Sequence, residues 1–244
     1  MKDNFSAQAS GYSNFRPDYP GEMIYFVQSI AKHHFAALDV ATGNGQVAKQ
    51  LSAYFAAVYA TDISQQQLDN AVRASNIFYR REPAEKSTFS DAQFDLITVG
   101  QAVHWFDFDV FYDEVRRILK PDGIFAILGY GLFYTNPDSD RIIRNFYHET
   151  LNGYWDIERK YIDENYKTIP FPFDELSVPT FENHLTWSYE QLTGYIETWS
   201  AAAHYRKKNG TNPLDVIRDE LRKSWEKSDK SVTFPLLLRI GQLK

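Results

Sequence analysis

Two acidic residues and a pair of glycines are the residues whose types and spacing first suggest chemistry. Asp39 lies in a short apolar run that leads into Gly43 and Gly45, and Asp62 ends a second apolar run. Glycine has no Cβ and tolerates positive φ, so the backbone can approach a ligand closely there. The spacing Gly43-x-Gly45-x-x-Ala48 also matches the dinucleotide fingerprint, with Asp62 near the position of the acid that holds a ribose. We therefore expect a ligand that contains a nucleoside.

Asp39 helps to distinguish between ligands that contain a nucleoside. A carboxylate just before the glycine turn would repel a pyrophosphate, whereas it would attract a cation. S-adenosylmethionine has an adenosine at one end, an ammonium and a sulfonium at the other, and no phosphate. Asp39 suits its cationic end and Asp62 its ribose hydroxyls. An NAD-linked oxidoreductase is the alternative hypothesis.

Strands alternating with helices must position these residues. The expected strands are residues 36–41, 57–62, 77–80, 94–100 and 124–129, and the expected helices are residues 21–34, 46–55, 64–72 and 108–119. Residues 120–123 predict a helix stop and a turn. A last strand at residues 231–241 contains Pro235, which favours an edge or a bulge. The predicted fold is α/β: a Rossmann-like, doubly wound sheet, mostly parallel with an antiparallel C-terminal strand.

The segment after Gly129 differs from this pattern because it is rich in aromatic residues and prolines. We expect helices at residues 139–151, 189–207 and 214–227, and a strand at residues 181–188. Long irregular segments in compact domains are usually functional covers, so residues 130–185 are predicted to be a lid insertion. The chain is expected to be one domain, residues 1–244. Its parts are an N-terminal arm and helix (1–35), a ligand-binding core (36–129), the lid (130–185) and C-terminal helices with the last strand (186–244).

Composition argues against several classes of function. The formal net charge of −6 does not suit a general nucleic-acid binder. No apolar run reaches the roughly 18 residues of a membrane span, and the N-terminus lacks the apolar region of a secretory signal. The absence of cysteine excludes disulfides and fits a cytoplasmic location. No metal-ligand spacing is present. We expect a small-molecule partner, no nucleic acid and no membrane, with the oligomeric state left open.

Several motifs resemble those of class I S-adenosylmethionine-dependent methyltransferases. Leu38-Asp-Val-Ala-Thr-Gly-Asn-Gly45 looks like the first motif of that family, with Ala41 where the family has its first glycine. Asp62-Ile63 resembles the pair at the end of its second strand, and Glu82-Pro-Ala-Glu85 its adenine-lining segment. Further matches are Phe94-Asp-Leu-Ile-Thr-Val-Gly100, Gln101-Ala-Val-His-Trp105 and Leu119-Lys-Pro-Asp-Gly123. These motifs keep the order of the family and cover residues 36–129.

The resemblance implies S-adenosyl-L-methionine as methyl donor, with S-adenosyl-L-homocysteine as product. The residues that it places at the donor are Arg16, Asp39, Ala41, Gly43, Asn44, Gly45, Asp62, Ile63, Ala84, Glu85, Gln101 and Ala102. Ala84 would contact adenine through its backbone. Arg16 would pair with a carboxylate of the donor or the acceptor, because its planar fork suits that geometry.

A narrower resemblance links the chain to the group that contains the trans-aconitate methyltransferases. It rests on Arg16-Pro-x-Tyr-Pro20, Gly129-Tyr130, Gly153-Tyr-Trp155, Thr198-Trp-Ser200 and the C-terminal run at residues 234–241. We therefore expect methyl transfer to a small molecule, with a carboxylate oxygen as the favoured acceptor. A protein that kept the fold but binds without turnover is another alternative.

Four residues are the candidates for the acceptor site. His104 and Trp105 follow the strand at residues 94–100, where the methyl group should be presented, and Tyr154 and Trp155 lie in the predicted lid. His104 is expected to orient the acceptor, and the alternatives are a base or a structural turn residue. A carboxylate acceptor is already ionised at pH 7 and needs no general base. For Trp105, Tyr154 and Trp155 the alternative is core packing.

Overall fold

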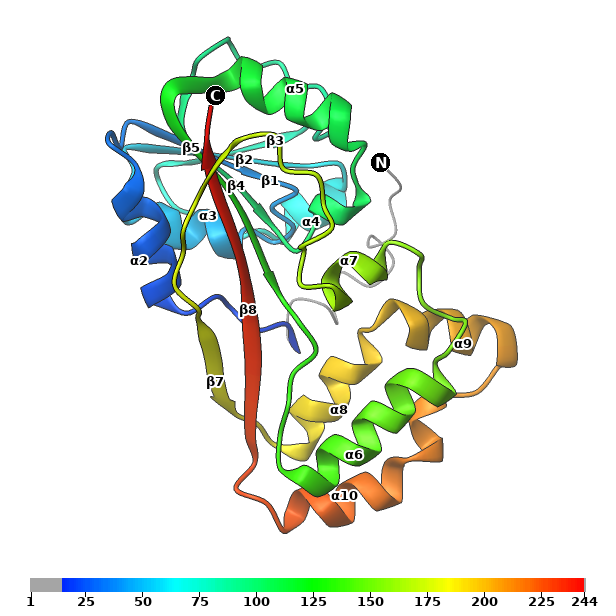
Figure 1. Cartoon of the computed structure of the whole chain (residues 1–244). Coiled ribbons are helices and arrows are strands. Elements are labelled where there is room, and N and C mark those ends of the chain that lie inside the picture. The colour runs from blue at the N-terminus through cyan, green and yellow to red at the C-terminus, as the bar shows by residue number, and fades with distance from the viewer. Residues whose placement is uncertain (1–14, 244) are drawn as a thin grey trace.

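A sheet forms the centre of the molecule (Figure 1). The computed structural model describes residues 15–243, so most of the predicted N-terminal arm lies outside the described residues. The strands are β1 (Ala36–Val40), β2 (Ala57–Asp62), β3 (Ile77–Arg81), β4 (Phe94–Gly100), β5 (Leu119–Tyr130), β6 (Asp174–Leu176), β7 (Glu182–Thr186) and β8 (Ser231–Gln242). The α-helices are α2 (Gly21–Ile30), α3 (Gln46–Leu51), α4 (Gln65–Asp69), α5 (Phe108–Ile118), α6 (Pro137–Asn145), α7 (Arg159–Asp163), α8 (Tyr189–Glu197), α9 (Ser200–Asn209) and α10 (Arg218–Glu226).

The order of the strands is β3-β2-β1-β4-β5-β8-β6, with β7 paired to β8. Strands β1 to β5 pair in parallel, and β8 runs antiparallel to β5. This confirms the predicted Rossmann-like, mostly parallel sheet. After β3 the chain returns to the other side of β1, so β1 and β4 flank a topological switch point. Ligands of α/β proteins bind at such points, beyond the carboxyl ends of the strands.

Both faces of the sheet are covered, which explains the continuous apolar runs of the sequence. Successive side chains of a strand point to opposite faces. Leu96 of β4 therefore packs in the cluster of α2 and α3, whereas Ile97 packs in the cluster of α5. Ile124 and Phe125 of β5 divide in the same way.

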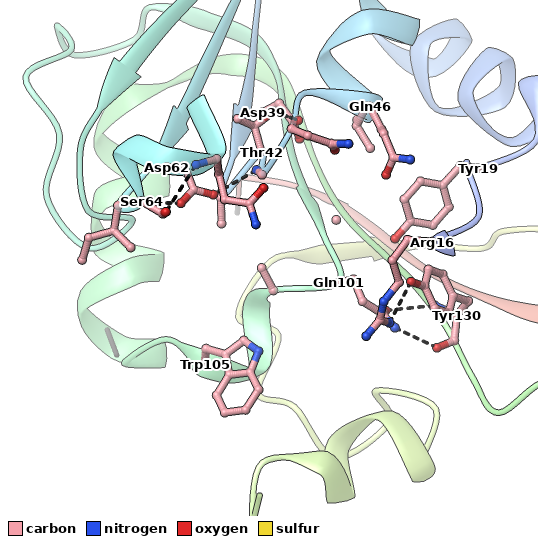
Figure 2. Close-up of a pocket in the computed structure, with 18 of the residues that line it drawn as sticks. Arg16, Tyr19, Asp39, Thr42, Gln46, Asp62, Ser64, Gln101, Trp105 and Tyr130 are labelled. Atoms are coloured by element: carbon pink, nitrogen blue, oxygen red, sulfur yellow. Dashed lines mark hydrogen bonds between the residues drawn. The ribbon is translucent and has the colours of Figure 1, made fainter. Parts of the chain in front are cut away.

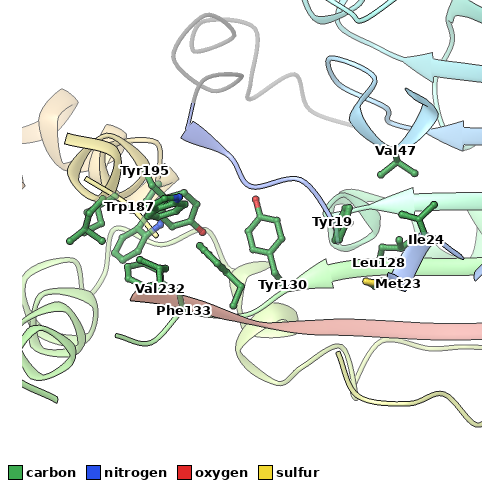
Figure 3. Packing of buried hydrophobic residues seen from close by; sticks show 14 of the residues in the cluster. Tyr19, Met23, Ile24, Val47, Leu128, Tyr130, Phe133, Trp187, Tyr195 and Val232 are labelled. Atoms are coloured by element: carbon green, nitrogen blue, oxygen red, sulfur yellow. The ribbon is translucent and has the colours of Figure 1, made fainter. Parts of the chain in front are cut away.

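The helices α6, α8, α9 and α10 lie together at one end of the molecule, where β5 and β8 extend beyond the other strands (Figure 1). Their apolar side chains continue the core cluster that covers one face of the sheet. Figure 3 follows this cluster through Met23, Val47, Tyr19, Tyr130, Phe133 and Tyr195. Helix α10 contacts both α6 and α8, so the expected division at residue 185 does not separate these helices in space.

The predicted helix at residues 189–207 is wrong in one respect, because it is two helices. Helix α8 ends at Glu197, and α9 begins at Ser200 after Trp199 in extended conformation, with φ −66° and ψ 137°. The Trp199 side chain is buried against Phe146, Tyr147 and Trp155. Tertiary packing of this ring therefore outweighs the helical propensity of the segment.

Three other predictions on the elements need correction. Residues 120–123 form a bulge within β5, since pairing with β4 shifts register between Leu119 and Ile124. Strand β6 lies in the lid segment, which was predicted to be irregular after its helix at residues 139–151. Strand β8 is not at an edge, because β5 and β6 flank it. The last residue pair between β5 and β8 is Tyr130 with Leu236, and Pro235 lies one residue beyond it. The N–H that proline lacks is therefore missing where the pairing ends.

The start of β1 is held by a buried carboxylate on β4. Asp95, whose side chain is 2% exposed, accepts hydrogen bonds from the backbone N–H groups of Phe35 (2.9 Å) and Ala36 (2.8 Å). Its other oxygen accepts from Lys120 Nζ at 2.6 Å. Asp95 thus links β1, β4 and the bulge of β5 at the end of the sheet opposite the switch point.

We predict that Asp95→Ala lowers the free energy of unfolding by about 3 kcal/mol, because it leaves two amides and a cation without their acceptor. The control is Asp122→Ala, which removes an exposed carboxylate 3.6 Å from His33 and should change stability by less than about 0.5 kcal/mol. Urea unfolding measures both values. Equal losses in the two variants would contradict this role of Asp95.

Candidate functional site

The turn between β1 and α3 uses left-handed backbone at alternate positions. Ala41, Gly43 and Gly45 have φ of 53°, 57° and 83°. Such values suit glycine and strain an alanine, so Ala41 adopts a conformation that a glycine would adopt without strain. A Cβ built on Gly43 meets no atom within 4 Å, whereas one on Gly45 would lie 2.2 Å from the Tyr79 hydroxyl. Gly43 is therefore needed for its backbone conformation alone, whereas Gly45 is needed both for its conformation and to avoid a clash with Tyr79.

Asp62 fastens this turn to the end of β2. Its Oδ2 accepts a hydrogen bond from the Gly43 N–H at 2.9 Å, and its Oδ1 accepts from the Ser64 N–H at 2.8 Å (Figure 2). Ser64 is also the N-cap of α4, with its side chain accepting from Gln67 N. One carboxylate thus sets the relative position of two loops at the carboxyl ends of β1 and β2.

Asp39 is 1% exposed and is held by two hydroxyl groups. Thr98 Oγ1 donates to its Oδ1 at 2.9 Å and Thr42 Oγ1 donates to its Oδ2 at 2.5 Å. Burial is the main cause that raises the pKa of Asp39 to about 6, and the two threonine hydrogen bonds oppose that rise. A cation beside this carboxylate would favour its ionised form.

A cavity opens at these loops; its atom-free space, including the open mouth, is about 960 Å³. It brings together nine residues that the sequence placed at the donor: Arg16, Asp39, Ala41, Gly43, Asn44, Asp62, Ile63, Gln101 and Ala102. Gly45, Ala84 and Glu85 do not line it. Ala84 is buried in the core cluster of α5, and Glu85 Oε1 accepts from the Asp107 N–H at 3.5 Å.

Other residues of this cavity were not predicted. They include Tyr19, Thr42, Gln46, Ser64, Gln67 and Tyr130. Figure 2 shows Tyr19, Arg16 and Tyr130 on one side of the cavity and Asp62 with Ser64 on another. Tyr19 and Tyr130 lie in motifs that the sequence had already singled out, and Ser64 follows Asp62 closely. Signals for these three were therefore present.

A second, smaller cavity adjoins the first, with about 480 Å³ of atom-free space. Its lining is Arg16, Gln101, His104, Trp105, Trp155, Asp156, Arg159, Ile162, Trp199 and Ser200. Arg16, Gln101 and Trp105 line both cavities. These three residues mark the junction where a group bound in one cavity would meet a group bound in the other.

Gln101 is fixed at this junction by its own backbone and side chain. Its φ is 54°, and its amide group both donates to the Tyr130 carbonyl (3.1 Å) and accepts from the Tyr130 N–H (3.0 Å). Arg16 reaches the same place, because Nη1 donates to the Tyr130 hydroxyl and Nη2 to the Thr198 carbonyl. The gap between α8 and α9 exposes that carbonyl.

His104 is buried beside the second cavity. Desolvation, followed by the positive charge of Arg159, lowers its pKa to about 3. The ring is therefore neutral at pH 7 and a weak base, with Nδ1 at 3.3 Å from the Tyr166 hydroxyl. The role of His104 toward an acceptor stays a prediction.

The two predicted lid residues differ in position. Trp155 lines the second cavity, and its Nε1–H donates to the Tyr147 carbonyl. Tyr154 does not line it: its ring packs against Tyr205 and its hydroxyl accepts from Asn209 on α9. A contact of Tyr154 with the acceptor therefore stays a prediction. Adjacent side chains in a short segment face different ways, and the sequence alone did not distinguish them.

Two further properties concern the described part of the chain. Within residues 15–243, no three His, Cys, Asp or Glu side chains are grouped so that they could hold a metal ion. None of the helices in that range has the length and apolar character needed to cross a membrane.

Several proteins that are similar to this chain in sequence or structure bear the name methyltransferase. Residues 38–127 match a family model described as a methyltransferase domain. A Dictyostelium discoideum protein that bears the name methyltransferase is 34% identical over 249 residues, covering 98% of this chain and 95% of that protein. A Saccharomyces cerevisiae protein named as an S-adenosylmethionine-dependent methyltransferase is 24% identical and covers 94% of this chain and 92% of its own. The structure of a type II methyltransferase from Anaeromyxobacter dehalogenans is 35% identical and covers 93% of this chain and 98% of its own, with a TM-score of 0.86.

We predict that Gly45→Ala destabilises the fold by about 2 kcal/mol or more, because the new Cβ combines left-handed strain with a clash against Tyr79. Gly43→Ala is the matched control. It has the same backbone strain without a clash and should cost only about 1 kcal/mol. Chemical denaturation of the ligand-free variants measures both. A larger loss for Gly43→Ala than for Gly45→Ala would contradict this explanation of the turn.

Proposed function

The chain belongs to the class I S-adenosylmethionine-dependent methyltransferases, and on that premise we propose that its first cavity holds the donor and its second cavity a small-molecule acceptor. The observation that carries the proposal is the shared lining of the two cavities by Arg16, Gln101 and Trp105. A methyl group presented at this junction would face an acceptor in the second cavity.

The lining of the first cavity fits this donor. Asp39 and Asp62 are its two acids and Arg16 is its arginine, which suits a cationic, phosphate-free ligand better than a pyrophosphate. Asp62 would hold the ribose hydroxyls, Asp39 would face the ammonium, and the open side of Gly43 would admit the ligand close to the backbone. Family membership sets aside the NAD-linked alternative. The adenine contacts of Ala84 and Glu85, and a direct donor contact by Gly45, stay predictions.

For the acceptor we favour a carboxylate oxygen, as in the group that contains the trans-aconitate methyltransferases. The bound donor supplies an electrophilic methyl carbon, and a lone pair of the carboxylate forms the new C–O bond while the electrons of the S–C bond pass to sulfur, so that a neutral ester and S-adenosylhomocysteine result. The protein aligns the reactants and excludes water. A weak base at His104 is compatible with this reaction, because no proton has to be removed.

The lining of the second cavity supports a small acceptor. Its walls include the rings of Trp105, Trp155 and Trp199. With a net charge of −6, this favours a metabolite-sized acceptor over nucleic acid, and a cytoplasmic location stays a prediction. The remaining alternative, binding without turnover, would show donor binding but no methyl transfer to any acid of a broad panel.

We predict that S-adenosylhomocysteine binds the wild-type protein and that Asp62→Ala weakens its binding at least tenfold, because both the ribose acceptor and the fastening of the turn are lost. Asp69→Ala, which removes a carboxylate that accepts from Gln65 on the exposed side of α4, is the control and should bind as the wild type does. Calorimetric titration gives all three affinities. Absence of binding by the wild type would exclude the proposed function.

Donor binding should also depend on pH through Asp39. Its pKa near 6 means that the carboxylate is ionised at pH 7.5 and mostly protonated at pH 5. Attraction to the ligand ammonium is therefore present above pH 6 and lost as the pH falls through that value. We predict roughly tenfold weaker binding of S-adenosylhomocysteine at pH 5 than at pH 7.5. Asp39→Asn should bind weakly at both pH values, and an unchanged pH dependence in that variant would rule out Asp39 as its source.

A further inference from the structure

We propose that Arg159 anchors a non-reacting anionic group of the acceptor, so that the acceptor carries a negative charge away from the atom that is methylated. This inference rests on the proposed function, since it assumes that the second cavity holds the acceptor. It assigns the positioning of the acceptor to a residue of α7 that no motif in the sequence had indicated.

The Arg159 side chain is held firmly on one side. Its Nε–H lies 2.7 Å from the Tyr147 hydroxyl and 3.2 Å from Asp163 Oδ1, which is one turn further along the chain. Its guanidinium carbon lies 5.3 Å from the centre of the Tyr147 ring and 4.9 Å from that of Trp155. These contacts fix the plane of the guanidinium before any ligand is bound.

The outer end of the same group has donors but no acceptors. The two Nη atoms carry four N–H donors, and in the described part of the chain neither of them makes a hydrogen bond. The side chain is only 17% exposed and lines the second cavity. The fork formed by the two Nη atoms can therefore receive an acceptor that enters this cavity. A carboxylate fills such a fork with two parallel hydrogen bonds.

The charged residues around Arg159 leave its Nη side as the place where an anion would bind. Arg16 and Arg159 line the second cavity, and Asp156 is the acid of the same lining. The Asp156 carboxylate lies 4.0 Å from His204 Nε2, and Asp163 lies 3.2 Å from the Nε of Arg159. His104 adds no charge, because its pKa is lowered to about 3. The two acids thus balance the two arginines, and Asp163 takes the Nε side of Arg159 and not its Nη side.

The position of Arg159 shows which part of the acceptor it would hold. Arg16, Gln101 and Trp105 line both cavities, whereas Arg159 lines the second cavity and not the first. A group in its fork is therefore set back from the junction where the methyl group arrives. If the reacting group is itself a carboxylate, the acceptor has at least two acidic groups, of which Arg159 holds the one that is not methylated. The tryptophan walls would cover the apolar part between them.

The test uses the protein saturated with S-adenosylhomocysteine and four diacids as probes: succinate, glutarate, adipate and isophthalate. Each is compared by calorimetry with its monomethyl ester, which keeps one carboxylate, and with its diamide, which keeps none. We expect at least one diacid and its monomethyl ester to bind, and the corresponding diamide to bind about 10- to 100-fold more weakly. Equal binding of diacid and diamide, or no binding of any diacid, would overturn the proposal without involving any variant.

Substitutions then locate the preference. Arg159→Gln should abolish the preference for acid over amide while leaving the affinity for S-adenosylhomocysteine within about twofold, and Arg159→Lys should retain part of the preference because it keeps the charge but loses the fork. Arg144→Gln is the matched control, since Arg144 also pairs with an aspartate one helical turn away but does not line the cavity. Retention of the full preference in Arg159→Gln would overturn the proposal. If the wild-type protein does not bind S-adenosylhomocysteine at all, the proposed function itself is excluded.

Discussion

The hydrogen bonds from Gly43 and Ser64 to the two oxygens of Asp62 are the interaction on which the site depends. They join the turn after β1 to the loop after β2. Along the chain these two segments are separated by α3 and β2. The turn itself is left-handed at three positions, one of them an alanine, so it needs such fastening to keep its shape. The first cavity lies beside this turn, at the switch point of the sheet.

The second cavity is built differently. It has no glycine turn, and its walls come from segments far apart in the chain: the loop after β4, the region around α7 and the gap between α8 and α9. Packing of Trp199 accompanies that gap, and the Thr198 carbonyl accepts a hydrogen bond from Arg16. Helices α8 and α9 belong to the main hydrophobic core, because the same cluster continues from the sheet into them (Figure 3).

The sequence predicted the parallel sheet and the glycine turn well because the signals for both are local. Apolar runs covered on both faces, glycines at positive φ and strand-end acids each leave a signal within a few residues. The second cavity depends on tertiary contacts that leave no such signal. Trp199 breaks a helix that propensity would continue, Tyr154 and Trp155 face different ways, and Arg159 is held in place by Tyr147 and Asp163, which no motif indicated. Residues 84 and 85 matched a motif, yet the structure does not bring them to the cavity lining.

A crystal structure of the protein with S-adenosylhomocysteine tests the two-cavity arrangement most directly. We predict that the ribose lies at Asp62 in the first cavity and that the sulfur faces the junction formed by Arg16, Gln101 and Trp105, with Arg159 on the far side of the vacant methyl position. A nucleoside bound in the second cavity, or a sulfur turned away from that junction, would contradict the arrangement.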